Sequence, residues 1–252
     1  MRPFEIAPEF IEEDNRVRRT RNPVTAEQMH NKHEALLPEE YAKNRRILDL
    51  GCGIGASGHW GLSFGAAHYV GVEMQQTYAD TARKLLNRYH PEKSTIYNES
   101  LDTWLTHNTE HFDVILLLAS LHFFTDYYTI LRSACARTDI LLVEESRPDP
   151  RLFHPQTAGV QFLENQTLNL ADEDSSAIGR GVKISPTGLA FILKDFGFSY
   201  AEMLVPKPIT MSRDVYAPGN ERYLMRFHRD EQHATPHRGF AEDLTIHPRK
   251  PW

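Results

Sequence analysis

The sequence has few cysteines for disulfide bonds and no long apolar run for a membrane span. Two cysteines in 252 residues exclude a disulfide framework and are typical of a protein of the reducing cytoplasm. No apolar run is long enough to cross a bilayer, and acidic residues stand where a secretion signal would be basic and then apolar. We therefore expect a cytoplasmic protein with no membrane partner.

Positive charge is also in short supply. The formal net charge is −6, from 28 Lys and Arg against 34 Asp and Glu, which argues against broad non-specific binding to nucleic acid. The one basic cluster, "NRVRRTRN" at residues 15–22, is interpreted as a solvated arm, with contact to RNA as the alternative. His233 and His237 lie four residues apart, but no cysteine or acidic residue completes a zinc spacing, so no metal is expected.

Short apolar strands alternate with amphipathic helices from Arg46 onward. Several strands are continuous apolar runs, as expected for parallel strands buried on both faces, so the series predicts an α/β, doubly wound, Rossmann-like sheet. A helix over 29–41 should precede the first strand, and "SPTGLAFILKDFGF" should form a helix capped by Ser185. The predicted strands are 46–50, 68–73, 94–97, 112–118, 139–145, 199–206 and 222–229.

This pattern divides the chain into three parts. Residues 1–45 are predicted to form an N-terminal arm and helical lid, 46–229 the main domain, and 230–252 a polar C-terminal tail. Within the main domain, 146–184 have little periodicity and are too long for a plain connection. Such a segment after a parallel strand is typical of an insert or lid that carries a binding site.

A glycine-rich turn, "LDLGCGIG", follows the first predicted strand. Glycines there let backbone N–H groups approach a ligand closely, as in sites for dinucleotides or for S-adenosylmethionine (SAM). Asp49 favours SAM, because a carboxylate beside the turn would repel a pyrophosphate but attract an ammonium group. Glu73 ends the second strand and could accept hydrogen bonds from ribose hydroxyls, and Met74 could cover one face of an adenine.

These residues resemble the class I SAM-dependent methyltransferases. "LDLGCGIG" is similar to the first motif of that family, "VGVEM" to the second and "FDVILLLASLHF" to the fourth, over about residues 46–145. The resemblance implies SAM as cofactor and a seven-stranded sheet of order 3-2-1-4-5-7-6 with the last strand antiparallel. It also implies a cofactor site in which Asp49 and Gly51 hold the methionine moiety, Gly53 and Gly55 form the turn, Glu73 binds ribose, and Glu99 or Ser100 meets adenine. Cys52 and Ala119 complete the predicted set.

Chemistry is expected at the carboxyl ends of the fourth and fifth strands. His122, in "ASLHFF", could accept a proton from a hydroxyl or amine, although it could instead be a structural histidine that shapes the pocket. Cations of the insert could bind a carboxylate or phosphate on the methyl acceptor, unless they form only local salt bridges. The predicted acceptor-binding residues are Tyr127, Arg147, Arg151, His154 and Arg180.

Three functions remain open at this point. The first is a methyltransferase of a small polar or anionic metabolite. The second is an RNA-modifying enzyme, since the layout is similar to that of the tRNA wobble-uridine carboxymethyltransferases, which carry Tyr-His-Arg where this chain has Leu121-His122-Phe123. The third is a non-catalytic SAM-binding module, with a dinucleotide dehydrogenase ranked last. The sequence leaves the oligomeric state open.

Overall fold

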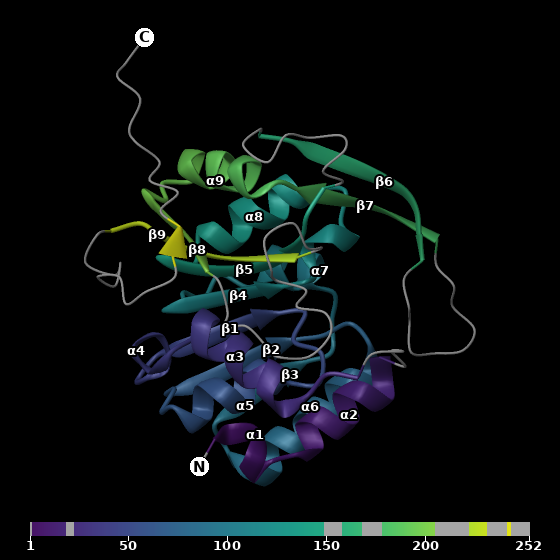
Figure 1. Ribbon diagram of the computed structural model, residues 1–252, viewed down its shortest axis with the longest axis vertical. Helices are drawn as coiled ribbons and strands as arrows, with labels where there is room; N and C mark the ends of the chain where they lie inside the picture. The colour runs from purple at the N-terminus through teal and green to yellow at the C-terminus, as the bar shows by residue number, and fades with distance from the viewer. Residues whose placement is uncertain are drawn as a thin grey trace.

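One mixed β-sheet forms the centre of the molecule, in a computed structural model that describes residues 2–18, 23–148, 158–167, 178–204, 222–230 and 241–242 (Figure 1). Its strand order is β10-β8-β9-β5-β4-β1-β2-β3. The strands are β1 (Arg46–Leu50), β2 (His68–Val72), β3 (Ser94–Tyr97), β4 (Val114–Leu118), β5 (Ile140–Ser146), β8 (Tyr200–Leu204), β9 (Arg222–His228) and β10 (Ala241–Glu242).

The predicted sheet is confirmed. Strands β1 to β5 pair in parallel, and β9 inserts antiparallel between β5 and β8, which gives the expected order. Seven strands match the predicted ranges to within about two residues. The structure adds to this sheet one strand that the sequence pattern did not indicate. In the segment predicted as a polar tail, β10 pairs antiparallel with β8 at the edge of the sheet.

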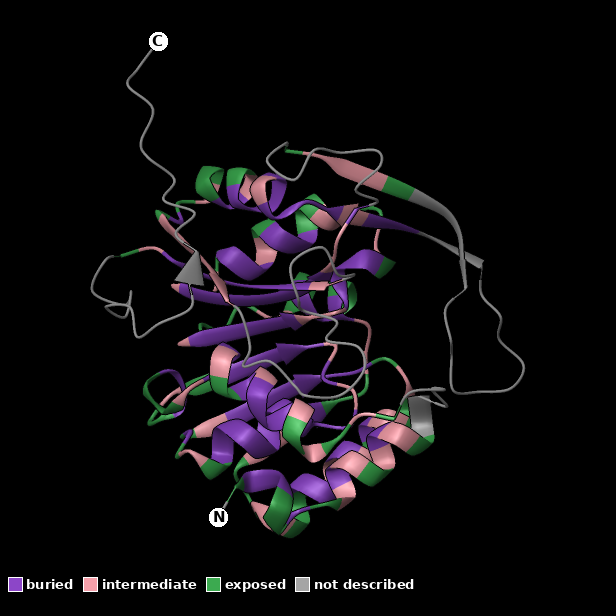
Figure 2. Cartoon of the chain, in the orientation of Figure 1, coloured by how far each residue is buried: buried purple, intermediate pink, exposed green. Residues whose placement is uncertain are grey.

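Helices cover both faces of the sheet. Because successive side chains of a strand point to opposite faces, Leu116 joins one apolar cluster and Leu117 the other. The first cluster holds the N-terminal helices together with α5 (Ala56–Ser63) and α6 (Gln76–Tyr89). The second holds α7 (Leu101–His107), α8 (Tyr127–Cys135) and α9 (Pro186–Asp195). Figure 2 shows the central strands buried and the exposed residues on the outer helices.

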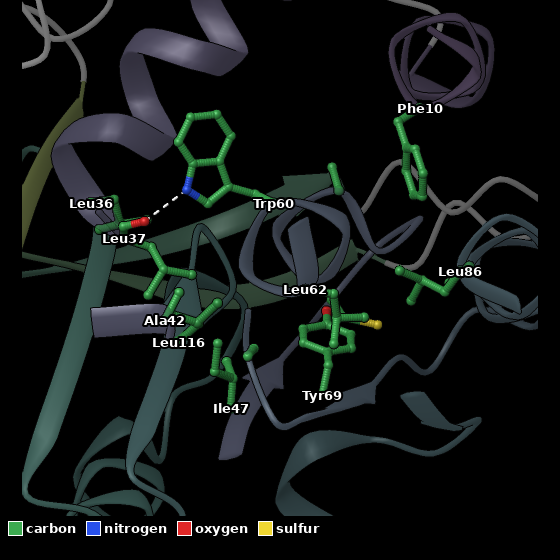
Figure 3. Packing of buried hydrophobic residues seen from close by; sticks show 14 of the residues in the cluster. Phe10, Leu36, Leu37, Ala42, Ile47, Trp60, Leu62, Tyr69, Leu86 and Leu116 are labelled. Carbon is green, nitrogen blue, oxygen red and sulfur yellow. Dashed lines mark hydrogen bonds between the residues drawn. The ribbon is translucent and has the colours of Figure 1, made fainter. Parts of the chain in front are cut away.

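The N-terminal helices pack against this framework. They are α1 (Pro3–Ile6), α2 (Glu9–Arg18), α3 (Ala26–Leu36) and α4 (Glu39–Ala42). The single helix expected over 29–41 is wrong, since α3 ends before Pro38, whose ring disfavours helical backbone at the preceding residue. Leu37 leaves the helical conformation, and its carbonyl accepts a hydrogen bond of 2.7 Å from the indole of Trp60, which fixes this end of α3 on α5 (Figure 3).

The segment after β5 contains a separate two-stranded antiparallel sheet. It is formed by β6 (Val160–Thr167) and β7 (Ile178–Ile184), and it extends beyond the main sheet in Figure 1. Strand β7 packs against β5 and against the short 3₁₀ helix η1 (Leu121–Phe123), which follows β4. The predicted cap of α9 is confirmed, because the Ser185 hydroxyl accepts a 3.0 Å hydrogen bond from the Gly188 N–H. No helix among the described residues has the length and apolarity needed to span a membrane.

Candidate active site

The glycine turn between β1 and α5 adopts a backbone that only glycine takes without strain. Gly51, Gly53 and Gly55 have φ of +87°, +55° and +81°. A Cβ at Gly51 would lie 2.8 Å from the Cβ of Ser120, so this glycine permits close packing of the β1 and β4 ends. A Cβ at Gly53 would meet no atom within 4 Å. The turn is therefore open at Gly53, where a ligand can lie against bare backbone.

Glu73 supports this turn from the end of β2. One carboxylate oxygen accepts a 2.9 Å hydrogen bond from the Gly53 N–H, and the other accepts one of 2.9 Å from the Gln75 N–H. Burial raises the pKa of Glu73, and hydrogen bonds from the backbone of Gln75, Gly53 and Met74 oppose that rise. Each oxygen keeps a second lone pair, so the carboxylate can hold the turn and still accept a hydrogen bond from a ligand hydroxyl.

Asp49, near the end of β1, presents a buried polar atom without a partner. The Tyr69 hydroxyl donates a 2.8 Å hydrogen bond to Oδ2, whereas Oδ1 is buried and unsatisfied among the described residues. Burial raises the pKa of Asp49 to about 7, against the opposing effect of the Tyr69 hydrogen bond. An unsatisfied buried carboxylate oxygen is costly. A cationic ligand placed beside Oδ1 would offset this cost.

A pocket extends from Asp49 and the glycine turn to the N-terminal helices and to strands β5 and β9. It contains five of the predicted cofactor residues, among them Asp49, Gly53 and Ala119. It also contains ten residues that the sequence analysis did not select, six of them polar or charged. Its lining is Asp14, Met29, Lys32, His33, Asp49, Gly51, Cys52, Gly53, Ile54, Ala56, Ser57, Leu118, Ala119, Glu144 and Arg222.

One wall of the pocket is a buried carboxylate held between two cations. Glu144, on β5, forms ion pairs with Lys32 of α3 and, at 2.6 Å, with Arg222 of β9. Burial alone would raise the pKa of Glu144, but the two cations outweigh it and hold that pKa well below its usual range. Sequence reasoning missed this group because its members lie far apart along the chain. The only signal was a pair of acids at the end of an apolar strand.

The predicted adenine contacts lie at the ends of β2 and β3. The Asn98 side-chain amide donates to the carbonyl oxygens of Glu73 and Met74, at 2.9 and 3.0 Å, and joins the two strand ends. Met74 is exposed, so its side chain is available to cover the adenine ring of a ligand. Glu99 pairs with His107 at 3.4 Å, and the Ser100 hydroxyl donates to Asp102. Neither side chain lines the pocket around Asp49.

His122 lies in η1, directly beyond the pocket wall at Ala119. Its Nδ1 is 3.0 Å from Oε2 of Glu145, and both side chains are almost fully buried. Ala119 has φ of +54°, a left-handed backbone that is uncommon for a residue with a side chain. Such conformations are found at functional sites more often than elsewhere, because the surrounding structure must hold them in place.

The predicted acceptor-binding residues are only partly placed. Arg147 is half-buried, with its guanidinium 5.7 Å from the centre of the Tyr223 ring, and its Nε donates to the Arg222 carbonyl at 3.4 Å. Tyr127 begins α8 and packs against the second apolar cluster. Arg151 and His154 lie outside the described residues, as does the side chain of Arg180. Among the described residues, no group of three or more His, Cys, Asp or Glu side chains could hold a metal ion.

Comparisons with known proteins point to one family. A family model described as a methyltransferase domain matches residues 47–138. An uncharacterized protein of Haemophilus influenzae is 26% identical over 112 residues, a match that spans 44% of each of the two chains.

Two solved structures share the fold. The N-terminal domain of EvdMO1, crystallised in the presence of SAH and D-fucose, has a TM-score of 0.55 and 16% identity over 81% of this chain and 82% of that one. Magnesium protoporphyrin IX methyltransferase from Synechocystis PCC 6803, with bound SAM, has a TM-score of 0.56 and 14% identity over 91% of this chain and 98% of that one. The family-model match identifies a methyltransferase domain at residues 47–138, and the strand order is that of the Rossmann-like fold which these two structures share.

Proposed function

We propose that this protein transfers the methyl group of SAM to a small polar or anionic molecule. The observation that carries the proposal is the buried, unpartnered Oδ1 of Asp49 beside the open backbone of Gly53. Asp49 would hold the cofactor ammonium, Gly53 would lie against its chain, and Glu73 would accept hydrogen bonds from its ribose. The cofactor supplies an electrophilic methyl group, so the protein has mainly to position the methyl acceptor.

The charge of the chain supports a small anionic acceptor over RNA. Lys32 and Arg222 form part of the pocket wall around the single carboxylate of Glu144, and the Arg147 Nε donates to the Arg222 carbonyl, so cations outnumber the acid along this wall. The net charge of −6 opposes the broad phosphate contacts that RNA binding requires. Both solved structures above are also associated, by name, with small molecules. Within the basic cluster, the Arg16 side chain is paired with Glu13 of the same helix at 2.6 Å, and Arg19 and Arg21 lie outside the described residues.

A labelling experiment tests the proposal. Purified protein is incubated with methyl-labelled SAM and with cell extract separated into small-molecule, RNA and protein fractions. We expect label in the small-molecule fraction, and we expect Glu73→Ala to abolish it through loss of cofactor binding. Glu110→Ala is the matched control, because Glu110 is an exposed carboxylate whose ion pair with Arg46 lies outside the pocket.

The other outcomes separate the alternatives. Label in RNA would replace the proposed acceptor class with the RNA-modifying one. Cofactor binding without label in any fraction would favour the non-catalytic SAM-binding module. Binding of NAD in place of SAM would contradict the cofactor assignment itself.

A further inference from the structure

Glu145 holds the ring and the backbone of His122 at the same time. The carboxylate lies at the end of β5 and is almost completely buried. Its Oε1 accepts from the backbone N–H of His122 at 3.3 Å, and its Oε2 lies 3.0 Å from the ring Nδ1. The Ser146 N–H donates a third hydrogen bond to Oε2, at 3.1 Å. Both oxygens are thus fixed, and the imidazole cannot rotate without breaking these contacts.

This arrangement determines which ring nitrogen carries the proton. An ionised carboxylate can only accept hydrogen bonds, so Nδ1 must be the donor. The neutral ring then keeps its lone pair on Nε2. In the described part of the chain, Nε2 has no hydrogen-bond partner. It is also not one of the fully buried polar atoms that lack a partner. Nε2 of His122 is therefore the ring nitrogen that can accept a proton.

The 3₁₀ helix that carries His122 lies between two other features of the molecule. On one side, Ala119 lines the pocket and Ser120 packs against the glycine turn, donating a 2.9 Å hydrogen bond to the Leu50 carbonyl. On the other side, η1 contacts β7 of the hairpin that follows β5. A methyl acceptor held between the cofactor pocket and this hairpin would lie beside His122.

We propose that Glu145 is a positioning residue that keeps His122 in the Nδ1–H form, so that Nε2 takes a proton from an O–H or N–H methyl acceptor. The inference rests on the proposed function and narrows its substrate class. In the step, the oxygen or nitrogen lone pair of the acceptor forms the bond to the methyl carbon as the carbon–sulfur bond breaks. That electron pair goes to sulfur, and the acceptor proton goes to Nε2 of His122. A thiolate or tertiary amine acceptor would need no such base.

The first test reads the tautomer directly and needs no acceptor. The full chain is labelled with ¹⁵N-histidine, and the His122 resonances are identified by their loss in His122→Gln. We expect the neutral ring to carry its proton on Nδ1 and to leave Nε2 unprotonated. In Glu145→Gln the new amide must turn its NH₂ toward a backbone N–H or toward the ring, and we expect the proton to move to Nε2. Wild-type His122 protonated at Nε2, or a tautomer unchanged by Glu145→Gln, would overturn the proposal.

A second measurement separates this inference from the proposed function. Calorimetric titration with SAH should give the same affinity for wild type and Glu145→Gln, because Glu145 lies outside the cofactor pocket. The initial rate of label transfer should fall by about 10²-fold or more in the variant. Glu202→Gln is the control, since Glu202 is a mostly buried carboxylate paired with Arg226 away from η1, and it should leave the tautomer unchanged. Failure of wild type to bind SAH would contradict the proposed function, while the tautomer still decides the role of Glu145. A transfer rate of Glu145→Gln within twofold of wild type would overturn the proposed role of Glu145.

Discussion

Lys32 of α3 and Glu144 of β5 form an ion pair that joins an N-terminal helix to the centre of the sheet at the edge of the pocket. Glu144 is almost fully buried, and Arg222 is its second cationic partner. A buried carboxylate is tolerated only when such partners offset its loss of hydration. The pair therefore fixes α3 against the wall of the pocket around Asp49.

Loss of Lys32 should destabilise the protein strongly. Lys32→Met leaves Glu144 buried with Arg222 alone, and we expect the free energy of unfolding to fall by about 3 kcal/mol. Chemical denaturation measures the change. Lys43→Met is the matched control, because Lys43 pairs with Glu39 on the exposed surface and its loss should cost less than about 1 kcal/mol. Equal losses in the two variants would contradict the account of the pair.

Cofactor affinity should depend on pH through Asp49. The pKa of this carboxyl is raised to about 7 by burial, and only its ionised form attracts an ammonium group. The affinity for SAH should therefore be highest above pH 7 and should fall by about tenfold between pH 8 and pH 6. Calorimetry at several pH values measures the effect.

Two variants test whether Asp49 is the titrating group. Asp49→Asn should bind SAH at least about tenfold more weakly at pH 8 and show little dependence on pH. Asp80→Asn changes an exposed carboxylate on α6 and should behave like wild type. An affinity that stays constant in wild type from pH 6 to pH 8 would argue against this role.

Acid should loosen the contact between the N-terminal helices and α5. A cluster of histidines and aromatic rings joins them, made of Phe4, Phe10, His30, His33, His59, Trp60 and His90. Burial lowers the pKa of His33 to about 3 and that of His90 to about 4, from an ordinary value of 6.5. Below pH 6.5, His33 and His90 therefore bind protons in the unfolded chain but stay neutral in the folded chain. The free energy of unfolding should be highest above pH 6.5 and should fall as the pH drops toward the folded-state pKa values of these histidines.

Denaturation at pH 7 and pH 5 measures this loss. His33 alone should account for about 2 kcal/mol between the two values, since it is fully buried. His33→Asn should lower stability at both values but reduce the difference between them by about that amount. His107→Asn, an exposed histidine on α7, should leave the difference unchanged. The prediction is wrong if His33→Asn keeps the wild-type pH dependence.

Much of the fold followed from local pattern. The apolar runs that became β1, β4 and β5 are nearly continuous because these strands are buried on both faces, and that signal survives in a single sequence. The Ser185 cap and the glycine turn are equally local, because a few neighbouring residues determine them. The hairpin β6–β7 escaped prediction because its two strands stabilise each other across a long connection, with weak alternation in either one.

The candidate site divides in the same way. Asp49, Gly53 and Glu73 could be selected because they lie at fixed distances from a strand end in the sequence. Lys32, Glu144 and Arg222 could not, because only the folded sheet brings α3, β5 and β9 together. The pairing of His122 with Glu145 also spans two strand ends, so sequence reasoning selected His122 but not its carboxylate partner.

The central claim is that SAM lies against the open backbone of the glycine turn, and calorimetric titration with SAH tests it most directly. Gly53→Ala adds a Cβ in the open space of the turn, whereas Gly65→Ala adds one at φ of +86° beside only the Lys43 side chain. Both changes place alanine in left-handed backbone, at a similar cost of about 1 kcal/mol. We predict that wild type and Gly65→Ala bind SAH alike and that Gly53→Ala binds about tenfold more weakly or not at all. Equal binding by all three proteins, or no binding by wild type, would contradict the account.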